Sequence, residues 1–133
     1  MNKISKCLVT GANGHLGNNL VRALIGQNYH VRASVRDLDN KRPFAGVKCE
    51  VVCADILDKN SLMIVMKDVE TVFHVASVFK HWSPDPQKDI IEPNVIGTKN
   101  VMEAAAECGV KKVILVSSIA ALDHSTVPMK EDT

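Results

Sequence analysis

The hydrophobic pattern of this chain alternates between short apolar runs and longer segments whose apolar residues recur at helical spacing. The short runs predict five β-strands, at residues 4–10, 30–35, 47–54, 71–76 and 112–117. The first helix is predicted after the first strand and ends near Gly26 and Asn28. Two more helices are predicted over 58–67, with Asp58 as its N-cap, and over 89–108.

Strands that alternate with helices predict an α/β fold, in which a parallel sheet carries helices on both faces. Right-handed crossovers then favour a doubly wound, Rossmann-type sheet with strand order 3-2-1-4-5. A chain of 133 residues suffices for one domain with a hydrophobic core, so we expect a single domain over 1–133. Pro93 interrupts the last helix, and we expect either a kink there or a regular helix that begins at about Pro93.

Charge and composition narrow the choice of partners. The formal net charge is +1, and 46% of the residues are hydrophobic, as in ordinary globular proteins. This balance gives no indication of a nucleic-acid partner or of an anionic membrane surface. No apolar run approaches the ~20 residues that span a bilayer, and the N-terminus lacks the apolar core of a signal peptide. We therefore expect a cytoplasmic protein.

The four cysteines are expected to be buried free thiols rather than disulfides or metal ligands. Cys49 and Cys53 both fall in the third predicted strand, where their spacing places them ~13 Å apart, too far for a disulfide. A metal site needs further ligands at fixed spacing, and the sequence offers none that converge with Cys7 or Cys108. We expect no bound metal.

Between the first strand and the first helix, the sequence from Thr10 reads Thr-Gly-Ala-Asn-Gly-His-Leu-Gly. In a phosphate-binding turn, Gly11 permits the tight turn, Gly14 lets a pyrophosphate approach the backbone, and Gly17 lets the helix pack closely. The helix start offers free N–H groups to the phosphates. The alternative is a corner whose glycines serve only packing, but the order of the surrounding elements favours nucleotide binding.

The remaining residues of this turn are also expected to line the nucleotide site. These residues are Asn13, His15 and Leu16. The His15 ring is placed either to donate a hydrogen bond to a phosphate or to point into solvent, and the sequence does not favour one over the other.

Arg36 ends the second predicted strand, where NAD-binding folds carry an acidic residue for the ribose 2′-hydroxyl. A guanidinium at this position suits the 2′-phosphate of NADP, which it can bind through several donors. Asp37 comes next and is expected to turn outward. The alternative is a solvated charge at a strand end, but the position favours NADP over NAD as the cofactor.

Two other strand ends are expected to contact the cofactor. Asp55 can accept a hydrogen bond from the adenine amino group while Ile56 covers the ring; the alternative is that Asp55 only caps a turn. Ala76 and Ser77 end the fourth strand, where small residues let a ribose lie against the backbone.

Five blocks of the sequence occur in a familiar order: 10–17, 55–56, 72–76, 94–98 and 116–118. Together they resemble the extended short-chain dehydrogenase/reductases. Within these, the chain is similar to the dihydroflavonol-4-reductase-like branch of the NAD-dependent epimerase/dehydratase family, which residues 31–37 also fit. The resemblance covers nearly the whole chain and implies hydride transfer between a nicotinamide and a carbonyl or alcohol substrate.

In this family a Tyr-x-x-x-Lys pair supplies the acid/base chemistry and a serine or threonine polarises the carbonyl; here that residue would be a serine. The match implies Ser118 as that serine, rather than its neighbour Ser117. The single tyrosine, Tyr29, is followed four residues later by Ala33, so the Tyr-x-x-x-Lys pair is absent from these 133 residues. The chain is thus interpreted as the NADP-binding portion of a longer oxidoreductase, truncated after the fifth strand, without its substrate lobe and inactive alone.

Two alternatives remain from the sequence: a non-catalytic module that senses NADP(H) or binds a partner, and a nucleotide-sugar epimerase or dehydratase. Truncation would leave the apolar run 113–116 at a free sheet edge, so a homo-oligomer that pairs through this edge is expected. His74 lies in the fourth strand and is expected to be a buried histidine with satisfied hydrogen bonds.

Overall fold

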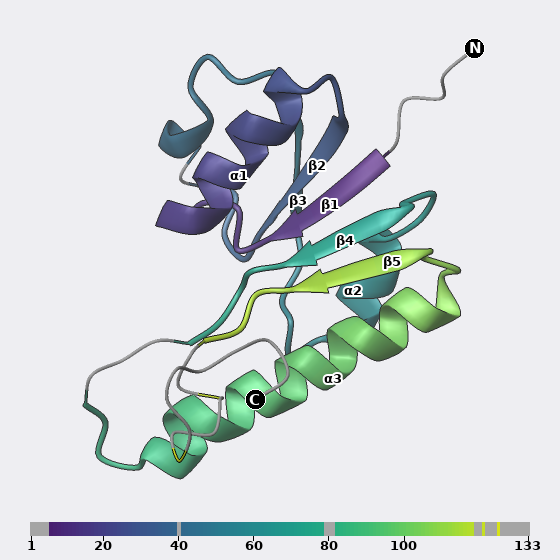
Figure 1. The fold of residues 1–133 in the computed structure, drawn as a ribbon. Helices are drawn as coiled ribbons and strands as arrows, with labels where there is room; N and C mark the ends of the chain where they lie inside the picture. Colours follow the sequence, from purple (N-terminus) through teal and green to yellow (C-terminus); the bar gives the residue numbers. More distant parts are fainter. Residues whose placement is uncertain (1–5, 40, 79–81, 119–120, 122–124, 126–133) are drawn as a thin grey trace.

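The computed structural model describes residues 6–39, 41–78, 82–118, 121 and 125. They form a five-stranded sheet flanked by helices (Figure 1). The strands are β1 (Lys6–Thr10), β2 (His30–Val35), β3 (Glu50–Cys53), β4 (Thr71–His74) and β5 (Lys112–Leu115). The helices are α1 (His15–Gly26), α2 (Lys59–Val65) and α3 (Glu92–Glu107), with a 3₁₀ helix at Arg42–Phe44 and a π-helical stretch at Gln87–Ile91.

The strands are parallel throughout and lie in the order β3-β2-β1-β4-β5, which confirms the predicted Rossmann-type topology. Helix α1 covers one face of the sheet, whereas α2 and α3 cover the other (Figure 1). The strand order reverses beside β1, between the β2 and β4 sides. In open α/β sheets, ligands bind outside the carboxyl ends of the strands at such a reversal.

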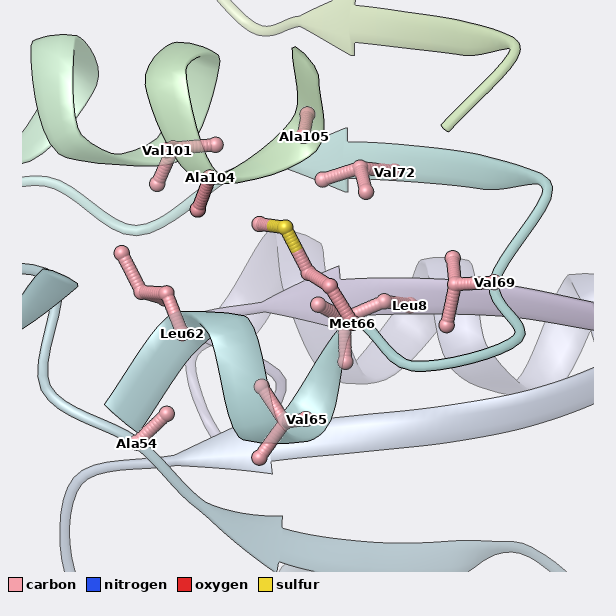
Figure 2. Close-up of a cluster of buried hydrophobic side chains, with 10 residues drawn as sticks. All are labelled: Leu8, Ala54, Leu62, Val65, Met66, Val69, Val72, Val101, Ala104 and Ala105. Carbon is pink, nitrogen blue, oxygen red and sulfur yellow. The ribbon is translucent and has the colours of Figure 1, made fainter. Parts of the chain in front are cut away.

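Neighbouring residues of β1 enter two separate hydrophobic cores. Val9 faces α1, whereas Leu8 faces α2 and α3, and both side chains are fully buried. The core around Leu8 is drawn in Figure 2 and consists of Leu8, Ala54, Leu62, Val65, Met66, Val69, Val72, Val101, Ala104 and Ala105. A slip of one residue in the β1 register would exchange the two faces, so the two cores together fix that register.

Strand β3 begins at Glu50, three residues later than the hydrophobic pattern predicts. The N–H of Val47 donates to the carbonyl of Phe44 at 3.0 Å, which continues the preceding 3₁₀ turn instead of the sheet ladder. The prediction that Cys49 lies in a strand is therefore wrong.

Strands β4 and β5 each end two residues earlier than predicted, at His74 and Leu115. In β4 the reason is a contact with the end of β1: the next two backbone N–H groups, of Val75 and Ala76, donate to the side chain of Thr10 at 3.0 Å each. The start of the first predicted strand, residues 4 and 5, lies outside the described residues.

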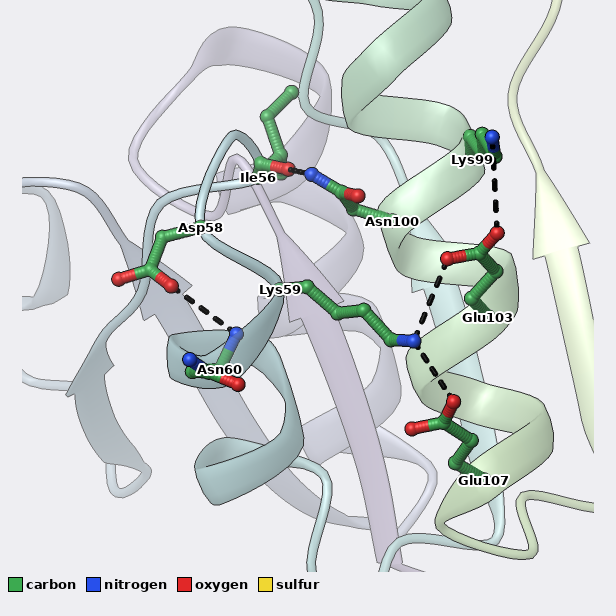
Figure 3. A network of polar contacts seen from close by, with 8 residues as sticks. All are labelled: Ile56, Asp58, Lys59, Asn60, Lys99, Asn100, Glu103 and Glu107. Carbon is green, nitrogen blue, oxygen red and sulfur yellow. Dashed lines mark hydrogen bonds and ion pairs between the residues drawn. The ribbon is translucent and has the colours of Figure 1, made fainter.

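Helix α2 is shorter than predicted, but its N-terminus is capped as expected. The Asp58 carboxylate accepts the N–H of Asn60 at 3.1 Å (Figure 3) and that of Ser61 at 3.4 Å. The next residue, Lys59, places its Nζ 2.8 Å from Glu107 and 3.4 Å from Glu103 of α3. Such exposed ion pairs contribute little to stability.

Pro93 marks the start of the regular helix rather than a kink. Helix α3 begins at Glu92, which confirms the second of the two expectations. The preceding stretch is π-helical, because the N–H of Glu92 donates to the carbonyl of Gln87, five residues earlier. Pro93 has no N–H for the carbonyl of Asp89 and its ring crowds that carbonyl, so a wider turn fits this position. None of the described helices combines the length and apolar character needed to cross a bilayer.

Candidate functional site

The predicted site residues follow the carboxyl ends of the strands, which parallel pairing brings to one edge of the sheet, here called the carboxyl edge. Gly11 follows β1, and Ala76 comes two residues after β4. The register pairs Val35 of β2 with Cys53 of β3, so Arg36 and Asp55 leave adjacent strands close together. Four segments far apart in the sequence therefore meet at the edge where the strand order reverses.

Two glycines of the turn are required by the packing of the chain itself. Gly11 has a φ of +62°, and a Cβ on it would lie 2.8 Å from the Cα of Ala76. A Cβ on Gly17 would lie 2.1 Å from the carbonyl oxygen of Gly11. No side chain fits in either gap without a backbone shift, so these glycines hold α1 and the end of β4 close to the turn.

Gly14 differs, because nothing in the described chain requires a glycine there. Its φ of −79° and ψ of 173° suit any residue, and an added Cβ would be 3.4 Å from its nearest neighbour, the Gly11 oxygen. Gly14 is the N-cap of α1, and its carbonyl accepts the N–H of Asn18. The side chains beside it in the turn are exposed: Asn13, His15 and Leu16.

Arg36 is exposed, and its guanidinium has no hydrogen-bond or ion-pair partner among the described residues. Two other arginines have partners within the fold. Arg32 donates to the Glu50 carboxylate and to two backbone carbonyls. Arg22 donates to the Pro43 carbonyl and to the side-chain oxygen of Asn18. The neighbouring Asp37 accepts the N–H of Asp39 at 2.9 Å and so closes its own turn. Arg36 therefore presents an unpaired positive charge at the carboxyl edge.

Asp55 does cap a turn, because its Oδ1 accepts the N–H of Leu57 at 2.9 Å. Its second oxygen has no partner within the part of the chain that the structure describes, so the turn leaves one acceptor available. The carbonyl of Ile56 accepts the Asn100 amide at 2.9 Å (Figure 3). The Ile56 side chain packs over Gly97, where a Cβ would lie 2.4 Å from its Cδ1.

The segment after β4 is held by α3. Ala76 is half-buried against the glycine turn, and Ser77 is exposed. The Asn94 side chain accepts the N–H of Val78 at 2.7 Å and donates to its carbonyl at 2.9 Å. This pair of bonds fixes where the chain leaves the sheet.

The positioning residues on α3 are not among those singled out from the sequence. The structure adds Asn94, Gly97, Thr98 and Asn100. A signal was present, since residues 94–98 form one of the five blocks that carry the resemblance. In addition, Asn94, Gly97 and Thr98 share a helix face with buried Val101, where an amphipathic helix would carry apolar side chains.

Ser117 and Ser118 are exposed and follow β5 at the carboxyl edge. Tyr29 lies at the opposite edge, just before β2, where it lines a surface depression with His30 and Lys48. The single tyrosine of this sequence is therefore at the wrong end of the sheet to act beside Ser118.

The cysteine prediction is only partly right. All four are free, but Cys53 is exposed and Cys49 and Cys108 are half-buried, so of the four only Cys7 is buried. Strand β3 is an edge strand, which leaves the Cys53 thiol at the surface, where it donates to the carbonyl of Arg36 at 3.3 Å. Partial burial raises the pKa of the Cys49 thiol. Across the described residues, no three His, Cys, Asp or Glu side chains gather as a metal site would require.

Known proteins are similar to this chain in sequence. Cinnamoyl-CoA reductase CAD2 of Medicago truncatula is 36% identical over 133 residues, covering 93% of this chain and 41% of that protein. Dihydroflavonol 4-reductase of Zea mays is 35% identical over 120 residues, covering 84% of this chain and 34% of that protein. The chain thus spans well under half the length of these curated relatives.

Two solved structures show the same fold. Yeast methylglyoxal/isovaleraldehyde reductase Gre2, complexed with NADPH, matches with a TM-score of 0.80 and 27% identity over 89% of this chain and 38% of its own. A short-chain dehydrogenase/reductase superfamily protein from Agrobacterium tumefaciens with bound NAD matches with a TM-score of 0.77 and 29% identity over 96% and 38%. The family model described as the NAD dependent epimerase/dehydratase family matches residues 7–133. The chain therefore belongs to the NAD dependent epimerase/dehydratase family, as its sequence blocks indicate.

Proposed function

We propose that this chain forms the NADP-binding part of an oxidoreductase that transfers hydride between a nicotinamide and a carbonyl or alcohol substrate. The observation that carries the proposal is the combination of Gly14 and Arg36 at the carboxyl edge. Gly14 is a glycine that the fold does not need, and Arg36 is a cation without a described partner. A pyrophosphate at the start of α1 accounts for the first, and a 2′-phosphate beside β2 accounts for the second.

The preference for NADP over NAD rests on Arg36. A 2′-phosphate offers the guanidinium charge-assisted hydrogen bonds, whereas a ribose 2′-hydroxyl calls for a carboxylate acceptor. Asp37, the adjacent carboxylate, already accepts the N–H of Asp39. The titles of the solved relatives name NADPH for the yeast reductase and NAD for the Agrobacterium protein, so both cofactors fit this fold.

Each remaining site residue has a role in this proposal. The free oxygen of Asp55 accepts the adenine amino group beside Ile56, and Ala76 and Ser77 lie against a ribose. The N–H groups at the start of α1 bind the pyrophosphate near Asn13, His15 and Leu16.

Ser118 donates a hydrogen bond to the substrate carbonyl oxygen and so polarises it. The nicotinamide, when bound, supplies or accepts the hydride. The chain covers 41% and 34% of the two reductases described above, so we assign the acid/base pair and most substrate contacts to a longer chain.

Two further features support proposals on location and assembly. Four free cysteines suit a reducing compartment, which supports the cytoplasm. At the β5 edge, Ile114, Leu115 and Val116 are 36%, 49% and 41% exposed. An apolar edge strand of this kind favours pairing between copies of the 133-residue chain, which supports a homo-oligomer of this chain.

Calorimetric titration with NADPH and NADH tests the cofactor assignment. We expect NADPH to bind more tightly, and Arg36→Ala to weaken NADPH binding about 10- to 100-fold while leaving NADH binding unchanged, as loss of charge-assisted bonds predicts. Lys67→Ala is the matched control, because it removes one exposed positive charge beyond the far end of α2. Equal affinity for both cofactors, or equal weakening of both by Arg36→Ala, would contradict the assignment.

A further inference from the structure

A chain of three polar side chains crosses the interior beneath the carboxyl edge. The Thr10 Oγ1 lies 2.8 Å from Nδ1 of His74, and Nε2 of the same ring lies 3.4 Å from Oγ1 of Thr98 on α3. Thr10 is 1% exposed and His74 is 2% exposed. The expectation of a buried, satisfied histidine is confirmed, and its bonds join β1, β4 and α3.

The direction of these bonds follows from counting lone pairs. The Thr10 oxygen accepts the backbone N–H groups of Val75 and Ala76 at 3.0 Å each, which uses both of its lone pairs. Its own hydrogen must then be the one that points at Nδ1 of His74. Nδ1 is therefore an acceptor, and the ring is the neutral tautomer with its hydrogen on Nε2, directed at Thr98.

The Thr10 hydroxyl lies directly below the glycine turn. Thr10 precedes Gly11, and the Ala76 N–H that it binds belongs to the residue whose Cα would be 2.8 Å from a Cβ on Gly11. The Thr10 hydroxyl thus binds the segment after β4 at the point where that segment approaches the turn. This seam, formed by Gly11 on one side and Val75 and Ala76 on the other, lies between two of the predicted cofactor contacts.

We propose that His74, as the neutral Nε2–H tautomer, is a positioning residue of the nucleotide site: its Nδ1 lone pair orients the Thr10 hydroxyl, which closes the seam. The link to NADP rests on the proposed function, whereas the tautomer and the seam rest on the geometry alone. Burial lowers the pKa of His74, which keeps the ring neutral around neutral pH. A proton on Nδ1 would face an oxygen whose lone pairs are both occupied.

The tautomer is tested by a two-bond ¹H–¹⁵N correlation spectrum of the full 133-residue chain, in which the proposal expects the hydrogen of His74 on Nε2. The seam is tested by hydrogen exchange at the amides of Val75 and Ala76. Thr10→Val and His74→Leu should speed this exchange about tenfold, as loss of one hydrogen bond predicts. Thr10→Ser keeps the hydroxyl, and His74→Asn places an amide oxygen near the position of Nδ1, so both should exchange like the wild type.

Calorimetry with NADPH tests whether this contact affects cofactor binding. Thr10→Val and His74→Leu should bind about tenfold more weakly, and the two conservative variants should bind within about threefold of the wild type. A hydrogen on Nδ1, or equal exchange and affinity in His74→Leu and the wild type, would overturn the inference. If the wild type binds neither NADPH nor NADH, the proposed function fails, while the spectrum and the exchange rates still decide the role of His74 in the seam.

Discussion

Alanine substitutions at Gly14, Gly17 and Gly26 separate a glycine that serves a ligand from one that serves the fold. All three residues lie in or at the start of the same helix, and each substitution adds one methyl group. At Gly17 the methyl carbon would sit 2.1 Å from a backbone oxygen, well inside van der Waals contact, so the turn or the helix must move. Overpacking against backbone that cannot rotate away costs about 1–3 kcal/mol or more.

At Gly14 the nearest atom is 3.4 Å away, and at Gly26 nothing lies within 4 Å. Gly14→Ala should therefore change the free energy of unfolding by less than about 0.5 kcal/mol. Gly26→Ala should raise it by about 0.4–1 kcal/mol, because alanine restricts the unfolded chain. If a pyrophosphate approaches the backbone at Gly14, its alanine variant should nevertheless lose most of its affinity for NADPH, whereas Gly26→Ala should bind normally.

Urea unfolding followed by circular dichroism, together with calorimetry, provides both measurements on the same samples. The informative result is a Gly14→Ala variant that is as stable as the wild type and does not bind. If that variant instead loses as much stability as Gly17→Ala, the glycines serve only packing, the alternative raised by the sequence. If it is stable and binds NADPH as the wild type does, the pyrophosphate does not approach the backbone there.

Three further outcomes are expected. Because burial lowers the pKa of His74 below 6.5, the unfolded chain binds more protons than the folded chain just below that pH. The unfolding free energy should therefore fall as pH drops from 6.5 towards the folded pKa, and His74→Asn should remove this contribution from urea titrations across that range. Gly97→Ala would bring a Cβ within 2.4 Å of the Ile56 side chain, so it should destabilise by about 1–3 kcal/mol, while Ile56→Ala in the same background restores part of the loss. Light scattering should show association that rises with concentration and is abolished by Ile114→Lys; a monomer at all concentrations would contradict pairing through the β5 edge.

The topology could be predicted from the sequence because it depends on local signals. The apolar runs, the glycine turn and the helical spacing between them already determine a parallel sheet with its order reversing beside β1. Asp58 could be assigned as a cap for the same reason, since its partners are two and three residues away. Strand ends were less predictable: residues 75 and 76 are apolar and could continue β4, but their N–H groups bind a side chain 65 and 66 residues away.

The candidate site shows the same division between local and distant contacts. Residues that follow a strand, such as Arg36 and Asp55, can be placed at the carboxyl edge from the strand pattern alone. The hydrogen-bond and ion-pair partners of those side chains could not be foreseen. Whether Arg36 has a partner, for example, depends on residues from other segments. Cys53 was misjudged because the predicted strand order, which already places β3 at an edge, does not say which of its side chains reach the surface.

Helix α3 shapes the carboxyl edge through polar side chains that lie on more than one of its faces. Asn94 accepts a hydrogen bond from the segment after β4, Thr98 contacts the His74 ring, and Asn100 donates to the loop after β3. Because one rigid helix with a rise of about 1.5 Å per residue carries all three contacts, it sets the spacing between loops that are distant in sequence. Each contact also leaves a partly buried backbone or ring partner unpaired when it is removed, at a cost of about 1–3 kcal/mol. The same side chains thus stabilise the fold and set the loop spacing, which explains why these positions are polar where packing alone would favour apolar residues.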